Sequence, residues 1–121
     1  MRTPKKFAPF IAVAVVAMAL AVPAAASAAW GSIALNPQTG QAGVAFNEQT
    51  KNSAKTAAVN DCPGQCRAVL FVRNKCGAIA RNDVRYTPGF GNSKSEAVKK
   101  AKAKARKGPG RVKLVAFVCS G

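Results

Sequence analysis

Four cysteines have the clearest potential chemistry in this chain: Cys62, Cys66, Cys76 and Cys119. Metal binding is disfavoured because the chain has no histidine and Cys62 and Cys66 are not separated by the two residues typical of zinc knuckles. In a short exported chain, four cysteines favour two disulfides. Three pairings are possible. A turn at Pro63-Gly64 would bring Cys62 to Cys66, which leaves Cys76 for Cys119.

The residue types that support catalysis are sparse and scattered. Histidine, the commonest general base near neutral pH, is absent. The acidic residues form no obvious pair: Glu48, Asp61, Asp83 and Glu96. No serine lies in a nucleophile elbow. The Gly-Pro-Gly at 108–110 lacks the spacing of a phosphate-binding loop and is expected to end a helix. We therefore expect no enzyme, no catalytic residue and no cofactor or metal.

Positive charge is the most prominent chemical feature of the remaining sequence. The chain has 19 basic and 4 acidic residues, a net charge of +15. Half of the basic residues outside the N-terminal segment fall in one acid-free stretch: Lys99, Lys100, Lys102, Lys104, Arg106, Lys107, Arg111 and Lys113. Such a run is either a solvated helix surface or a site for an anionic partner, such as phosphates, acidic glycans, anionic lipid, envelope polymers or an acidic protein surface.

The aromatic residues argue against specific nucleic-acid recognition. Most occupy strand positions that indicate a core role rather than platforms for bases: Trp30, Phe46, Phe71, Tyr86, Phe90 and Phe117. The apolar residues of the basic segment are alanines and Val98, which are too small to insert deeply into a lipid interface. Adsorption to an anionic surface is therefore favoured over insertion.

An internal duplication predicts the elements that position these residues. Residues 31–36 and 63–72 recur at 77–82 and 109–118, with nine of sixteen positions identical at an offset of 46. Unrelated stretches would match at about one position in that many. A unit repeated this closely predicts two copies of one structural motif.

Each copy is expected to contain two strands, a helix and a third strand. The strands are predicted at 31–36, 42–47 and 67–73, and again at 77–82, 85–91 and 111–119. The helices are predicted at 50–60 and 94–107, with Ser93 or Ser95 as a cap. The helices match at an offset of 43, which a shorter second hairpin and a longer second helix would explain.

This β-β-α-β order, repeated, predicts a small single α+β domain with pseudo-twofold character and disulfide staples. The last strand of each copy is apolar on both faces, which is typical of a central, covered strand.

The N-terminal segment has the pattern of a secretory signal peptide. Basic residues precede an uncharged apolar run from Phe7 to Val22, and Ala26-Ser27-Ala28 offers a cleavage site. Sixteen apolar residues are fewer than the roughly twenty needed to span a bilayer. We expect cleavage near Ala28, one domain over 29–121 in two repeats (about 30–75 and 76–121), and a location outside the cell or in its envelope. Removing Arg2, Lys5 and Lys6 leaves 16 basic and 4 acidic residues, or +12.

Several motifs together resemble the bacterial exported domain-of-unknown-function family 4189 (DUF 4189). They are the Trp30–Ala34 opening, Gly43–Asn47, Cys66–Val72, Asn74–Ala80 and the closing Val115–Cys119. The resemblance implies a small secreted or envelope-associated domain with disulfides, and supplies no catalytic residues. It also implies cysteines at the end of the second helix and before the last strand. Here those places hold residues near Ala105 and Val112, so the second copy is expected to lack a local bridge.

Three functions are compatible with the sequence. The first is a secreted, noncatalytic cationic protein that binds an anionic partner through the Lys-rich helix and adjacent turn. The second is a secreted effector or toxin-like protein that acts on a host or competitor cell. The third is a structural component of the envelope. The sequence leaves the partner and the oligomeric state open.

Overall fold

The computed structural model describes residues 29–121, so the predicted signal peptide at 1–28 lies outside the described residues. The elements follow the predicted order twice. They are β1 (Trp30–Leu35), β2 (Ala42–Glu48), α2 (Lys51–Asp61), β3 (Arg67–Arg73), β4 (Lys75–Arg81), β5 (Tyr86–Gly91), α3 (Lys94–Ala105) and β6 (Lys113–Ser120). The predicted β-β-α-β repeat is confirmed.

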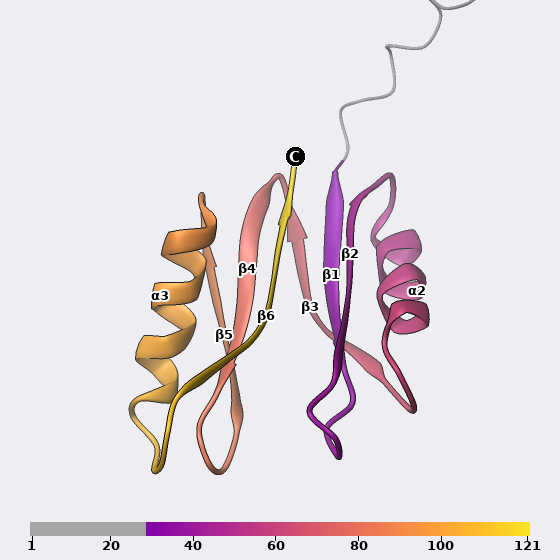
Figure 1. The fold of residues 1–121 in the computed structure, drawn as a ribbon. Coiled ribbons are helices and arrows are strands. Elements are labelled where there is room, and N and C mark those ends of the chain that lie inside the picture. Colours follow the sequence, from indigo (N-terminus) through magenta and orange to yellow (C-terminus); the bar gives the residue numbers. More distant parts are fainter. Residues whose placement is uncertain (1–28) are drawn as a thin grey trace, which may run out of the picture.

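Each copy forms its own antiparallel sheet of three strands. The strand order is β2-β1-β3 in the first copy and β5-β4-β6 in the second. The two sheets face each other, and the helices cover the outer faces, α2 on one side and α3 on the other (Figure 1). The result is a four-layer α+β domain with the pseudo-twofold relation that the duplication predicts.

The layers are held together by three apolar clusters. Ile33 and Ile79, one from each central strand, meet Leu70, Val72 and Val118 between the sheets. On the outer faces, alanines of the sheets pack against alanines of the helices. These small residues allow close approach of the backbones. At Gly89, a Cβ atom would lie 2.2 Å from the Ala101 nitrogen, so only glycine fits beneath α3.

The register confirms that the copies correspond between the first and third strands, whereas a register shift in β1–β2 has no counterpart in β4–β5. A bulge in β3 occurs where Ile33 pairs with Leu70 and Ala34 with Ala68, and β6 has the same irregularity opposite β4. The first hairpin loop covers 36–41, whereas the second covers only 82–85. Helix α2 has 11 residues and α3 has 12. The expected shorter hairpin accounts for the change of offset from 46 to 43, because its loop is two residues shorter and β5 is one residue shorter than β2. The helix is one residue longer, as expected, and a connection after α3 that is two residues longer restores the offset of 46.

The prediction that the last strand of each copy is central is wrong. Strands β1 and β4 are central, whereas β3 and β6 are hydrogen-bonded on one side only. Their apolar character has a different cause. One face of β6 packs against β1 and β2 of the opposite sheet, and the other side approaches α3. Strand β6 therefore contacts both the opposite sheet and α3, although Leu114, Phe117 and Cys119 remain exposed.

The expectation that most aromatic side chains belong to the core is also wrong. Phe46 is 59% exposed, and Phe90 and Phe117 are each 38% exposed. Trp30, Phe71 and Tyr86 are half-buried. The alanine-lined layers lie too close together for large rings, so the core consists of aliphatic residues and the aromatic residues lie at its margins.

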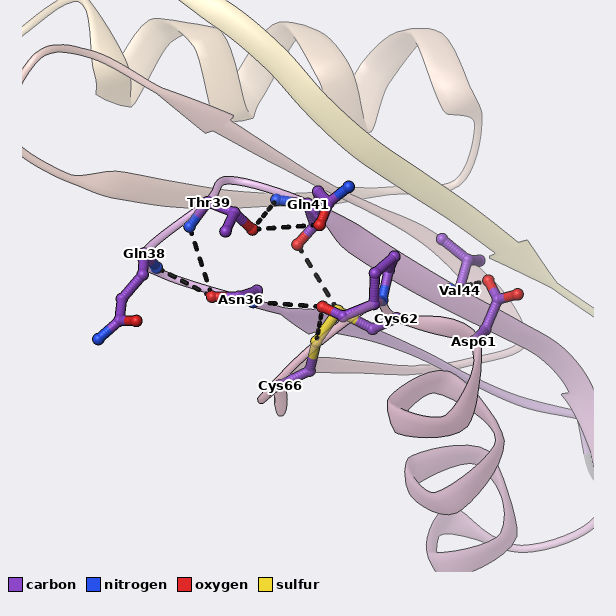
Figure 2. The surroundings of a disulfide bond; sticks show 9 residues. Asn36, Gln38, Thr39, Gln41, Val44, Asp61, Cys62 and Cys66 are labelled. Atoms are coloured by element: carbon purple, nitrogen blue, oxygen red, sulfur yellow. Dashed lines mark hydrogen bonds between the residues drawn. A yellow bond between two sulfur atoms is a disulfide. The ribbon is translucent and has the colours of Figure 1, made fainter.

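The two disulfides join Cys62 to Cys66 and Cys76 to Cys119. This is the pairing that the Pro63-Gly64 turn favours. Figure 2 shows the first, at the end of α2. The Asn36 amide donates to the Pro63 carbonyl at 3.2 Å, and the Cys62 sulfur contacts the Gln41 carbonyl oxygen at 3.6 Å. The second disulfide joins residues directly opposite each other on β4 and β6. It therefore fixes the last strand to the centre of its sheet.

Candidate anion-binding surface

Helix α3 begins at a cap that its sequence specifies. Ser93, not Ser95, is the N-cap, and its hydroxyl accepts from the Glu96 backbone N–H at 3.1 Å. The Glu96 carboxylate in turn accepts from the Asn92 backbone N–H at 2.7 Å. The first bond satisfies a donor that a helix N-terminus leaves free, and the second fixes the residue before the cap. A negative charge at this end is also favoured by the helix dipole. The cap fixes the start of the helix and the direction of every later side chain.

The buried face of α3 is a stripe of alanines. Ala97, Ala101 and Ala105 recur every four residues and are fully buried. Helical geometry therefore places the basic residues on the two flanks of this stripe. One flank carries Lys100, Lys104 and Lys107, and the other carries Lys99, Lys102 and Arg106. All are exposed except the half-exposed Lys102. Both flanks therefore present positive charge to solvent.

The turn after α3 extends this surface. The Gly108 N–H donates to the Ala105 carbonyl at 3.1 Å, and the Pro109 carbonyl accepts from the Asp83 N–H at 3.0 Å. Gly110, at φ +89°, lies so close to the Asp83 carboxylate that no side chain fits. The turn therefore ends the helix and fixes it against the β4–β5 hairpin.

Beyond the turn, the last two candidate residues continue the positive surface. Arg111 and Lys113 are exposed, and Lys113 lies opposite Arg81 across β4 and β6. The structure thus brings the end of α3, the turn and the start of β6 together at one end of the molecule, while Lys99 and Lys100 lie further along the helix (Figure 1).

Little negative charge compensates for these cations. Within residues 29–121 the single ion pair joins Lys100 Nζ to Glu96 at 3.3 Å. The hydrogen bond from the Asn92 backbone, and then Lys100, hold the pKa of Glu96 below its ordinary value. Glu96 therefore stays ionised but is already engaged by its own helix. The remaining basic residues of α3 have no acidic partner in the described part of the chain.

The equivalent helix of the first copy has a different surface. Its buried alanines, Ala54 and Ala58, match Ala97 and Ala101. Its basic residues are only Lys51 and Lys55, and its last turn contains no basic residue. The strong positive charge is therefore a property of the second helix and not of the scaffold.

Sequence reasoning missed one basic residue of α3. Lys94 Nζ lies 4.0 Å from the centre of the Phe117 ring, and the corresponding Lys51 lies 4.8 Å from the centre of Phe71. The repeat could have revealed this contact. The two lysines correspond at the helix offset of 43 residues and the two phenylalanines at the strand offset of 46 residues. A first-turn lysine over a ring of the last strand is thus a feature of both copies.

Two of the other acidic side chains accept hydrogen bonds within the fold. Asp61 accepts from the Val44 backbone at 3.0 Å, and Glu48 from the Ser53 hydroxyl at 2.5 Å. Among residues 29–121, no group of histidine, cysteine, aspartate and glutamate gathers in a way that suits a metal ion. No helix in this range is long and apolar enough to cross a membrane.

Comparison with known proteins gives one clear result. No curated protein and no solved structure matches the chain. The family model described as "Domain of unknown function (DUF4189)" matches residues 30–119, which include both helices and all strands apart from Ser120, the last residue of β6. The chain therefore belongs to the DUF4189 family.

Proposed function

We propose that this protein is an exported, noncatalytic binding protein that holds an anionic partner against α3 and the turn that follows it. The single observation that carries the proposal is the charge on α3. The helix has positive side chains on both flanks of its alanine stripe, and its one acidic residue is held by its own N-terminus and by Lys100. A rigid surface of this kind attracts polyanions or acidic protein surfaces without needing a pocket.

Export is supported by the disulfides and by the N-terminal segment. Two disulfides persist in an oxidising compartment, and all four cysteines of the chain are used in them. A signal-like segment precedes the domain. Together they favour action outside the cell or in its envelope.

The proposal is tested by retention on immobilised heparin over a range of salt concentrations. Because contacts between charges are screened by ions, retention of the native domain should weaken steeply as salt rises. The variant K99Q/K102Q/K104Q leaves the Lys100–Glu96 pair intact and should elute at much lower salt. The matched control K51Q/K55Q/K75Q removes the same charge elsewhere and should elute close to the native domain. Equal shifts for both variants would contradict a site on α3.

A further inference from the structure

The two edges of the sandwich are closed to different degrees. At one edge β2 packs along β6, where Ala42 and Val44 approach Val115 and Ala116 within the same apolar cluster. The end of this edge is closed by hydrogen bonds. The Asn47 N–H donates to the Ser120 hydroxyl at 2.8 Å, and the Gly121 N–H donates to the Asn47 side chain at 3.1 Å.

The opposite edge, between β3 and β5, is open. The two strands make little contact, and a cavity of about 340 Å³ lies between them. Its base is formed by Leu35 and Ile79, and its sides include Val69 of β3 and Pro88 of β5. Val69 is 40% exposed, although it lies beside the core. Cavities of this size that are mainly apolar are typical of small-molecule sites. We call this cavity the β3–β5 cleft.

The rim of the β3–β5 cleft carries positive charge only. Arg67 and Arg85 contribute to its lining, and no acidic residue does. Neither arginine forms an ion pair within residues 29–121. The backbone of Arg85 is held by its hairpin, because its N–H donates to the Asn82 side chain at 3.0 Å. The cleft therefore combines a mainly apolar lining with two arginines that form no ion pair within residues 29–121.

Other nearby groups are already engaged. The Arg81 guanidinium lies 5.3 Å from the centre of the Tyr86 ring and donates to the Asn82 carbonyl at 3.3 Å. Asp83, the acidic residue of this hairpin, lines an adjoining hollow of about 250 Å³ with Arg81. That hollow shares Pro37, Arg85 and Tyr86 with the cleft. Asp83 itself does not line the cleft, so the charged residues of the cleft lining favour an anion.

The geometry points to the β3–β5 cleft as a binding site for a small amphiphilic carboxylate. Its hydrocarbon or aromatic body contacts Leu35, Ile79 and Val69. Its carboxylate lies at the rim, where the planar fork of an arginine matches a carboxylate with two parallel hydrogen bonds. Both parts are required, because an apolar body alone leaves the arginines unpaired and a small anion alone does not fill the apolar floor.

Decanoate, below its micelle concentration, is a suitable probe in an NMR titration of the whole domain. We expect saturable shifts of the Val69, Ile79 and Tyr86 resonances. Decanol should bind at least tenfold more weakly, and acetate should leave these resonances unchanged. The variant R67Q/R85Q should lose at least tenfold in decanoate affinity, whereas K99Q/K104Q, with the same change in net charge, should keep native affinity.

A second variant tests the apolar half of the site. V69W places a ring over the cleft and should remove decanoate binding while both arginines remain. Equal affinities for decanoate and decanol, or equal losses in the two charge variants, would overturn the proposal. The same holds if these resonances shift with protein concentration alone, because the cleft would then be covered by a second copy. No residue of α3 lines the cleft, so a negative result with decanoate would leave the proposed binding of an anionic partner to α3, and its heparin test, unaffected.

Discussion

The two copies of this domain share a scaffold but differ in what stabilises it and in what it presents to solvent. Both have a central strand with a buried glycine near its start (Gly31 or Gly77), an alanine-faced helix, and a lysine over a phenylalanine ring. The second copy adds a helix with basic residues on both flanks. The comparison shows that packing between layers requires the common features, while the exposed helix surface is free to differ.

The covalent staples also differ at matched positions. Trp30 lies opposite Arg73 across β1 and β3, and 46 residues later Cys76 lies opposite Cys119 across β4 and β6. The first pair stacks, with the guanidinium carbon 5.5 Å from the ring centre, and the second is a disulfide. The reverse occurs after the helices. Cys62 and Cys66 form the local bridge, whereas Ala105 and Val112 pack in an apolar cluster. As expected, the second copy lacks a local bridge.

The largest predicted effect concerns these two disulfides. Cys76–Cys119 closes a separation of 43 residues, whereas Cys62–Cys66 closes only 4. Loop-closure entropy therefore predicts losses of about 4 kcal/mol for C76A/C119A and about 2 kcal/mol for C62A/C66A. Chemical denaturation of each variant measures the difference. A smaller loss for C76A/C119A than for C62A/C66A would show that the local bridge dominates.

The next effect concerns two asparagines that occupy matched positions. Asn82 is 2% exposed, donates to the Ala105 carbonyl at 2.8 Å and accepts from two backbone N–H groups of its hairpin. The bonds of Asn36 are longer, from 3.1 to 3.4 Å. We expect losses of unfolding free energy of about 3 kcal/mol for N82A and about 1 kcal/mol for N36A. Thermal and denaturant unfolding should rank them in this order, and the opposite order would contradict the comparison.

A smaller effect is expected at Ser32 and Ala78, which also correspond at an offset of 46. The Ser32 hydroxyl is buried and has no hydrogen-bond partner in the described structure. S32A should therefore leave stability unchanged or raise it by about 1 kcal/mol, whereas A78S should lower it by about 2 kcal/mol. Matched denaturation curves compare the two. A clear loss in S32A would reveal a bond that the hydroxyl makes.

The smallest effect is a pH dependence of the unfolding free energy. It should arise at the N-terminus of α3, whose first turn contains Glu96, and not at that of α2, whose first turn contains no acidic residue. The pKa of Glu96 is lower in the folded domain than in the unfolded chain, where it is about 4.3. The ionised carboxylate therefore stabilises the folded domain above the unfolded pKa, and this stabilisation is lost as the pH falls through the folded pKa. E96Q should therefore be less stable than the native domain at pH 7 and equally stable at pH 2. K99Q, which removes an exposed charge without a partner, serves as the control. If E96Q differed from the native domain by the same unfolding free energy at pH 7 and pH 2, the charge of Glu96 would be excluded as the cause of the difference.

The sequence allowed the repeat, the order of elements and a serine cap on the second helix to be predicted, because each depends on local spacing. Ser93, three residues before Glu96, marks the start of α3 in the sequence itself. Strand order depends instead on which layer covers each face. The apolar pattern of Val69 to Val72 is the same whether a second strand, a helix or an opposite sheet covers it, so the edge position of β3 was not predictable.

The candidate site was predictable in composition but not in shape. Lys99 to Lys113 were identified from charge alone, and the structure adds their division into two flanks and the fixed turn. The β3–β5 cleft was not predictable, because Arg67 and Arg85 come from different copies and meet only when the sheets pack.

The difference in charge between the copies is tested most directly by mapping backbone amide shifts during titration with a short heparin oligosaccharide at low salt. The predicted result is that the largest shifts fall on α3 and on residues 106–113, that α2 changes little, and that added salt reverses the shifts. Shifts of equal size on α2 and α3 would contradict a site confined to the second copy.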